Sequence, residues 1–234
     1  VMAALVTDKP RPGIDFFPLQ VDYREKTSAA GKFPGGFFKR EGRPTLKEVL
    51  TMRMIDRPMR PLFPRDFLNE VQVYTMVLSA DGRNDPDVLA MVGASAVAAL
   101  APVPWDGPTG SLRIAHVGEE WKVNPTHAER EYADAELLLA GVKGHINMIE
   151  VGAREISEET LMEGITAAQP HIDTICEMIQ ELVEKAGKEP EYDPLGPSKE
   201  LVDRVREMAA GRIKQAKLNP DKLARNDAVD AVEA

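Results

Sequence analysis

The sequence places two aromatic residues beside two cations in a short glycine-rich stretch. Phe37 and Phe38 follow the pair Gly35-Gly36 and precede Lys39 and Arg40. Exposed rings stack on the bases of single-stranded nucleic acid whatever their identity, while cations hold its phosphates. Glycines disfavour helix and strand, so we expect a loop that presents these four side chains. The alternative is that one phenylalanine lies in the core and anchors the loop.

The charge around this loop is opposite to that of the rest of the chain. The whole sequence has a formal net charge of −9 and a pI near 5.1. Residues 32–65 nevertheless hold nine Lys or Arg against three acids, a local charge of +6 that leaves −15 on the remainder. A phosphate backbone binds to a local cationic surface and does not sense the average charge. The acidic pI therefore does not exclude nucleic acid.

A helix is predicted immediately after the loop, from Leu46 to Arg57. Thr45 and Glu48 have the spacing of a capping box, and Pro58 closes the segment.

Arginines occur on the helix stripe that should be buried. At about 100° per residue, Leu46, Leu50, Arg53 and Arg57 fall on one stripe, and Arg60 follows in a proline-rich exit. Either these arginines pair with buried acids, or that face borders a cavity or interface that holds an anion.

No catalytic constellation is apparent elsewhere. Asp81, Asp85 and Asp87 could hold Mg²⁺ through water, but a polar turn with Asp85 as N-cap and Pro86 at the first helical position explains them more simply. The four histidines lack metal-ligand spacing.

Strand and helix patterns alternate along the rest of the chain. We expect a buried strand at residues 1–6, a half-buried strand at 19–24 and a central strand at 71–79. Small residues mark a closely packed helix over 87–100, and four further strands are expected at 111–117, 121–123, 136–142 and 147–151.

A long amphipathic helix is predicted from Ser157, with Pro170 causing a kink or separating two abutting helices. Its apolar stripe comprises Leu161, Ile165, Ala168, Ile172, Ile175, Ile179 and Leu182. Residues 187–197 hold three prolines and two glycines and are predicted to be a linker, after which Leu201, Val205, Met208 and Ile213 indicate a helix too short to bury much alone.

Composition sets the broad class of the chain. The 234 residues are 43% apolar and 29% charged, which is typical of a soluble globular protein of one or two domains. No apolar run is long enough for a membrane span, and the single Cys176 excludes an internal disulfide. The chain starts inside an apolar stretch without an initiator Met, so we expect an N-terminally truncated fragment.

Several motifs together resemble one family. They are GGFFKREGRPTLKEVLTMRMIDRPMRPLFP at residues 35–64, DFFPL at 15–19, NEVQV at 69–73, NDPDVLAMVGASA at 84–96 and GPTGSLRI at 107–114. The chain resembles the bacterial-type polynucleotide phosphorylases along nearly its whole length. The likeness is to their first RNase PH-like core domain.

The resemblance implies an α+β fold, an RNase PH-like core of the ribosomal protein S5 domain 2-like type followed by the start of an all-α domain. Residues 1–187 would be the N-terminally truncated core, 188–197 a linker, and 198–234 the C-terminally truncated start of the helical domain.

The resemblance also implies a function. The family degrades single-stranded RNA from the 3′ end with inorganic phosphate as co-substrate, releasing nucleoside diphosphates in mRNA turnover. Its Mg²⁺ site and main catalytic site are expected outside this segment, so no catalytic or metal-binding residue is assigned here. A cytoplasmic homotrimer, with partners in an RNA degradosome, is implied.

By that resemblance the segment supplies RNA gripping and ring assembly. The RNA-binding residues are Phe37, Phe38, Lys39 and Arg40 at the pore of the ring, with Arg53, Arg57 and Arg60 near its inner face. Lys39 stands where the family pattern has Arg or Lys, and a lysine lacks planar stacking and bidentate phosphate contact.

Two other readings stay open. The chain could be a non-catalytic RNA-binding or scaffold subunit of an exosome-like RNase PH ring. It could also be a generic α+β domain whose basic patch binds an acidic protein.

Overall fold

The structure, a computed structural model, describes residues 1–233 and divides into two units, the first ending at Pro194 and the second starting at Leu195. The first unit contains, in order, β1 (Met2–Asp8), β2 (Leu19–Glu25), η1 (Thr27–Ala30), α1 (Leu46–Met59), η2 (Arg60–Leu62), β3 (Glu70–Val77), α2 (Asp87–Leu100), β4 (Gly110–Val117), β5 (Glu120–Val123), α3 (His127–Arg130), β6 (Ala135–Val142), β7 (His145–Ala153) and α4 (Glu158–Ala186). The mixture of sheets and helices confirms the predicted α+β class.

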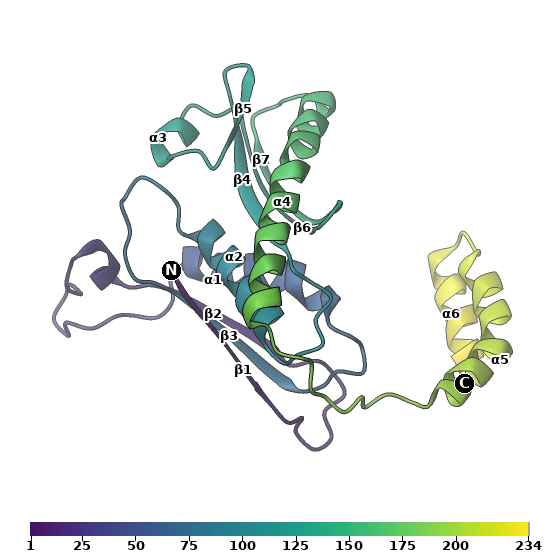
Figure 1. Cartoon of the computed structure of the whole chain (residues 1–234). Helices are drawn as coiled ribbons and strands as arrows, with labels where there is room; N and C mark the ends of the chain where they lie inside the picture. Colours follow the sequence, from purple (N-terminus) through teal and green to yellow (C-terminus); the bar gives the residue numbers. More distant parts are fainter. Residues whose placement is uncertain (234) are drawn as a thin grey trace. The chain divides into compact units, whose positions relative to one another are not determined.

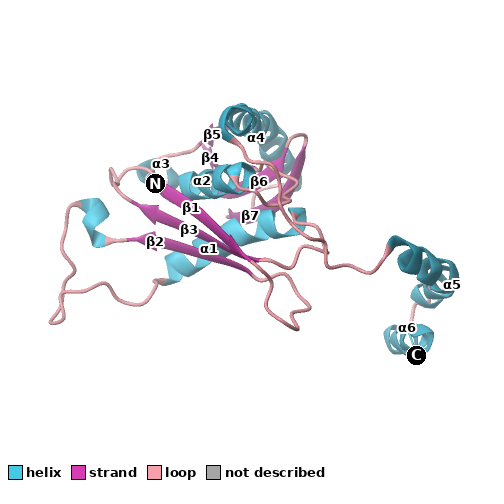
Figure 2. Cartoon of the chain, turned by 60° about the horizontal axis from the view of Figure 1, so that its bottom comes forward, coloured by secondary structure: helices cyan, strands magenta, loops and turns pink. Residues whose placement is uncertain are grey.

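The first sheet has the order β1-β3-β2, with β3 antiparallel to β1 and parallel to β2. Val73 of β3 pairs with Leu5 of β1 and Val21 of β2, so the central place predicted for β3 is confirmed. The prediction that the first strand is buried was wrong. β1 is an edge strand whose alternate residues face solvent, and Val6 is 64% exposed. Figures 1 and 2 show α1 and α2 on one face of this sheet.

Helix α2 has the predicted bounds and lies close to the first sheet. Ala90, Ala94 and Ala98 are buried, and a Cβ on Gly93 would lie 3.2 Å from the Cβ of Ala3 on β1. Small side chains thus allow the close approach. The N-cap is Pro86 and not the predicted Asp85, whose carboxylate forms ion pairs instead.

The second sheet has the order β5-β4-β6-β7 and is antiparallel throughout. Helix α4 packs on β4 and β6 (Figure 1). The buried stripe of this helix includes Ala168, Ile172, Cys176 and Ile179, while the predicted Leu182 is 42% exposed.

Pro170 lies inside α4, which is one continuous helix, so of the two predicted alternatives, a kink or two abutting helices, the second was wrong. The buried residues Ala168 and Ile172 on either side of the proline anchor the helix to the sheet, and this packing compensates for the one backbone hydrogen bond that the proline removes.

The segment after α4 stays on the first unit for several residues. The backbone N–H of Lys188 donates to the Leu100 carbonyl at 3.2 Å, and the Tyr192 ring meets Phe67 edge-on with centroids 5.5 Å apart. Part of the predicted linker 188–197 is therefore docked. The domain boundaries at 187 and 198 stay a prediction.

The second unit is a pair of contacting helices, α5 (Lys199–Lys217) and α6 (Lys222–Glu233). Helix α5 confirms the predicted helical segment, and it buries none of its residues. No helix in the described part of the chain is long and apolar enough to cross a membrane.

Candidate nucleic-acid interface

The segment between β2 and α1 extends beyond the ends of the strands (Figure 2). Phe37 and Phe38 at its tip are 94% and 75% exposed. The alternative that one ring anchors the loop in the core is therefore wrong. Lys39 and Arg40 are exposed beside them, and neither forms an ion pair with any residue of the described range 1–233.

The backbone of the tip turns sharply. Gly36 has φ of 75°, a left-handed conformation that glycine adopts without steric cost, and Lys39 also has a positive φ of 50°. The Phe37 and Phe38 rings meet edge-on with centroids 5.5 Å apart, and the Arg40 guanidinium carbon lies 5.2 Å from the Phe38 centroid. The tip presents a small cluster of rings and cations to solvent.

Polar contacts hold the base of this loop. The Glu41 carboxylate accepts hydrogen bonds from the backbone N–H and the hydroxyl of Thr27, both at 2.9 Å. Glu48 at the start of α1 accepts bonds from the Thr45 backbone N–H at 2.6 Å and from the Glu25 backbone N–H at 2.9 Å. The first of these completes the predicted capping box. The loop therefore leaves and rejoins the fold at fixed points.

The exposed side of α1 is the stripe predicted to be buried. Leu46 and Leu50 are 76% and 48% exposed, and Arg53 lies on the same side. The buried side carries Thr51 and Ile55, which face the first sheet. Apolar residues occur on both sides of this helix, and sequence periodicity alone selected the wrong one.

The three arginines of α1 and its exit differ in their partners. Arg53 is exposed and forms no ion pair with a described residue. Arg57 pairs with Glu150 of β7. Arg60 pairs with Asp56 at 2.6 Å and donates to the carbonyls of Phe17 and Leu19, both at 3.1 Å. Arg57 and Arg60 thus follow the ion-pair interpretation, although their partners are not fully buried.

A cluster of ion pairs that the sequence did not reveal connects the start of α2 to the second sheet. Arg113 of β4 pairs with Asp87 and Glu136, and Arg130 pairs with Glu136 at 2.6 Å and with Asp85 at 3.0 Å. Arg113 is only 8% exposed. An arginine between Leu112 and Ile114 in a strand was the one signal available in the sequence.

The cluster shifts the acidities of its carboxyl groups. Burial raises the pKa of Asp85, but pairing with Lys47, Arg113 and Arg130 outweighs burial and holds the pKa below its ordinary value. For Asp87, burial dominates over the Arg113 charge and raises the pKa.

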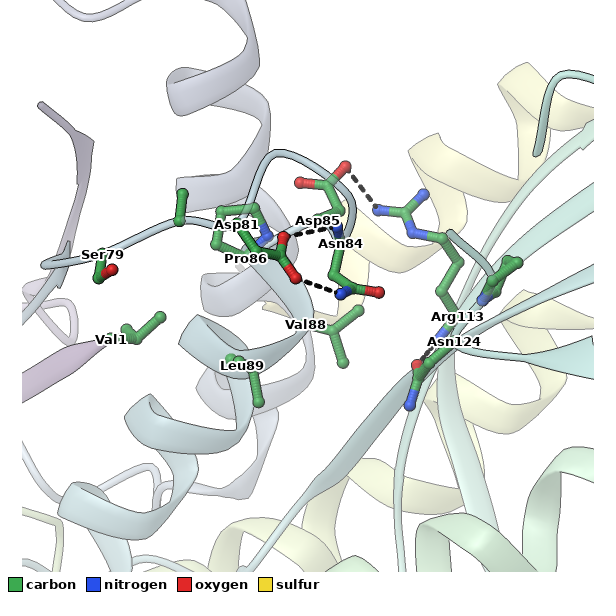
Figure 3. A pocket seen from close by; sticks show the side chains of 12 residues that line it. Val1, Ser79, Asp81, Asn84, Asp85, Pro86, Val88, Leu89, Arg113 and Asn124 are labelled. Atoms are coloured by element: carbon green, nitrogen blue, oxygen red, sulfur yellow. Dashed lines mark hydrogen bonds and ion pairs between the residues drawn. The ribbon is translucent and has the colours of Figure 1, made fainter. Parts of the chain in front are cut away.

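A pocket of about 450 Å³ adjoins this cluster (Figure 3). It is lined by apolar side chains, including Val88 and Leu89, and by the charged side chains of Asp81, Asp85 and Arg113. Asp81 and Asp85 would repel an anion, and Arg113 is already paired with Asp87 and Glu136, so the pocket offers no unpaired cation to phosphate.

Nor does the cluster fit Mg²⁺. The carboxylates of Asp85, Asp87 and Glu136 are already paired with guanidinium groups. Throughout residues 1–233 there is no group of three acidic, His or Cys side chains that could hold a metal ion.

Comparison with known proteins identifies relatives. Residues 1–103 match the RNase PH family, described as the 3′ exoribonuclease family, domain 1. The chain is 43% identical over 234 residues to the polyribonucleotide nucleotidyltransferase of Caldicellulosiruptor bescii. This match covers 100% of this chain and 33% of the relative. The chain is 44% identical over 233 residues to the polyribonucleotide nucleotidyltransferase of Heliobacterium modesticaldum, and that match covers 99% of this chain and 33% of the relative. The chain thus spans about a third of the length of these curated relatives.

A solved structure shares the fold. Rice (Oryza sativa) Rrp46 is similar with a TM-score of 0.61 and 14% identity, over 77% of this chain and 82% of that one.

Proposed function

The chain carries a domain of the 3′ exoribonuclease (RNase PH) family over residues 1–103, and from that premise we propose that it is the RNA-gripping segment of a polyribonucleotide nucleotidyltransferase. Phe37, Phe38, Lys39 and Arg40 contact single-stranded RNA, and Arg53 adds a phosphate contact. Arg57 and Arg60 border the same surface while holding α1 in place through their ion pairs.

The proposed reaction is phosphorolysis. An oxygen of inorganic phosphate bonds to the phosphorus of the 3′-terminal phosphodiester, the bond from that phosphorus to the preceding ribose 3′ oxygen breaks, and this 3′ oxygen takes up a proton. A nucleoside diphosphate leaves. Inorganic phosphate as co-substrate and Mg²⁺ act in other parts of the enzyme, and this segment contributes RNA binding.

One observation carries the proposal: two adjacent rings and two unpaired cations are exposed together on a loop whose base is fixed. A protein does not gain stability from exposing two phenylalanines, whereas an unpaired base gains a stacking surface from them. The cations hold the strand without regard to sequence.

Assembly multiplies this contact. Stacking on a ring contributes about 1–3 kcal/mol per base, too little for one loop to hold RNA tightly. A cytoplasmic homotrimer, in contact with partners of an RNA degradosome, would bring three loops to one strand and raise the overall affinity.

The second candidate is a non-catalytic RNA-binding subunit of an exosome-like ring. The paired acidic cluster is compatible with both candidates, because the first also expects the metal outside this segment. The two candidates differ in the activity expected of the full-length parent protein. Under the first candidate the parent protein releases nucleoside diphosphate from poly(A) when phosphate is added, and under the second it does not.

The test is a titration of labelled oligo(A) with the 234-residue chain at two salt concentrations, followed by fluorescence anisotropy. Binding that weakens with salt and resists competition by an acidic protein is expected. Equal competition by the acidic protein, or no binding at all, would overturn the proposal in favour of a different partner. In a phosphorolysis assay the chain alone is expected to release no nucleoside diphosphate.

A further inference from the structure

A third phenylalanine of the same loop is as exposed as the pair at its tip. Phe33 is 93% exposed, compared with 94% for Phe37. Within residues 1–233 its ring forms no aromatic pair and packs in neither hydrophobic cluster. The fold therefore gives no packing reason for an aromatic side chain at this position.

The backbone holds Phe33 away from the protein. The turn before it is fixed, because the Lys32 backbone N–H donates to the Thr27 carbonyl at 3.1 Å and Gly31 ends η1 in a left-handed conformation with φ of 68°. Pro34 follows, and a residue before proline is restricted to extended conformations. Less conformational freedom is then lost when the ring binds a ligand.

The charges around this ring match a phosphate backbone. The loop itself carries four cations that form no ion pair with a described residue, namely Lys32, Lys39, Arg40 and Arg43. The one acid, Glu41, is hydrogen-bonded to Thr27 at the base. An exposed ring beside unpaired cations is the arrangement that binds single strands.

Phe33 and the tip are separate contact points. Phe37 follows Phe33 by four positions, so their Cα atoms are at most about 14 Å apart. Only Phe37 and Phe38 form a ring pair in the loop. A base on Phe33 and a base on the tip would therefore belong to different nucleotides of one strand.

We propose that Phe33 is an additional stacking residue, which lengthens the stretch of single-stranded RNA that the loop holds. This inference rests on the proposed RNA-binding function. Phe33 contributes to long strands that reach both contact points and not to short ones held by the tip alone.

The experiment compares oligo(A) of about 4 and about 12 nucleotides, lengths within the site sizes of single-strand-binding proteins. For Phe33→Ala in the 234-residue chain, affinity for the longer strand is expected to fall by about fivefold or more, the effect of losing one stacked base. Affinity for the shorter strand stays within about twofold of the unmodified chain. Because the ring is exposed, far-UV circular dichroism and thermal unfolding are expected to be unchanged.

Two substitutions at the same position separate stacking from apolar contact. Phe33→Leu keeps an apolar side chain without a flat ring and is expected to lose as much affinity as Phe33→Ala. Phe33→Trp restores it, and the fluorescence of the new tryptophan is quenched by the longer strand. Full affinity for Phe33→Leu, or no quenching in Phe33→Trp, would overturn the inference.

Phe16 is the matched control. It is 64% exposed but lies in the segment between β1 and β2, outside this loop. Phe16→Ala is expected to leave both affinities unchanged, and an equal loss there would overturn the assignment to Phe33.

The outcomes distinguish the inference from the function on which it rests. If Phe37→Ala with Phe38→Ala weakens binding and Phe33→Ala does not, the inference that Phe33 stacks on RNA is wrong and the proposed function stands. If the unmodified chain shows no salt-dependent binding, both are wrong.

Discussion

The Glu48 carboxylate accepts a hydrogen bond from the Glu25 backbone N–H at 2.9 Å, which joins the first turn of α1 to the last residue of β2. The same carboxylate caps its own helix through Thr45. One nearly buried side chain therefore closes the whole loop that carries the exposed rings. The tip can bind a strand without its ends separating.

This contact predicts a loss of stability when it is removed. Glu48→Ala deletes bonds from three donors, and we expect the free energy of unfolding to fall by about 2–3 kcal/mol. Urea denaturation at neutral pH measures the change. Glu41→Ala is the control, since its exposed bonds to Thr27 lie beyond the closure and should cost less than about 1 kcal/mol. Equal losses for the two variants would contradict the role given to Glu48.

The buried cluster predicts a pH-dependent effect. Arg113→Met leaves Asp87 and Glu136 without that partner and is expected to destabilise the fold by about 3–5 kcal/mol at pH 7. Burial raises the pKa of Glu136, yet pairing with Arg130 and Arg113 outweighs burial and lowers the pKa, as pairing also does for Asp85. An acid whose pKa is lowered on folding stabilises above its unfolded pKa, and this contribution is lost as pH falls through the folded pKa.

The difference between Arg113→Met and the unmodified chain should therefore shrink in acid. Urea denaturation at pH 7 and below about pH 4, the ordinary range of carboxyl groups, checks this. A difference that does not change with pH would mean that packing, and not charge, accounts for the loss.

Substitution of Arg53 should affect RNA binding, whereas substitution of Arg60 should affect the stability of the fold. Arg53→Ala removes an exposed cation without an ion pair, so we expect unchanged stability and a salt dependence of RNA binding that is weaker by about one phosphate contact. Arg60→Ala removes bonds to two carbonyls and Asp56 and should cost about 2 kcal/mol of stability. Affinity titrations over a salt series, with thermal unfolding alongside, distinguish them. A stability loss in Arg53→Ala would show a structural role.

Lys39 offers a gain of function. Lys39→Arg keeps the charge and adds a planar guanidinium that stacks and contacts phosphate in a bidentate manner, so affinity for oligo(A) is expected to rise by about twofold or more. Lys39→Gln, which keeps a long polar side chain without charge, should lower it. The same affinity for all three side chains would exclude Lys39 from the interface.

The sequence predicted the regular elements well where one face is buried. Helix α2 has the predicted bounds, and Ala168, Ile172 and Ile179 of α4 lie in the core as predicted. Exposure of Phe37 and Phe38 also followed from the glycines before them. Local composition and period determine such features.

Long-range pairs could not be predicted in this way. Asp87 and Arg113 are 26 positions apart, and Asp85 and Arg130 are 45 apart, so only the packing of α2 and α3 against the second sheet brings them together. Asp85 accordingly looked like a helix cap. Helix α1 has apolar residues on two sides, and packing against the first sheet buries the side with Ile55 and leaves Leu50 exposed. The periodicity of the sequence does not show which of the two sides is buried.

The most direct test of RNA gripping is the affinity of the 234-residue chain carrying Phe37→Ala and Phe38→Ala for labelled oligo(A), measured by anisotropy at one low salt concentration. Because both rings are exposed, the thermal midpoint should not change. We predict that affinity falls by at least about fivefold, the loss of one or more stacked bases. Unchanged affinity with an intact fold would contradict the account.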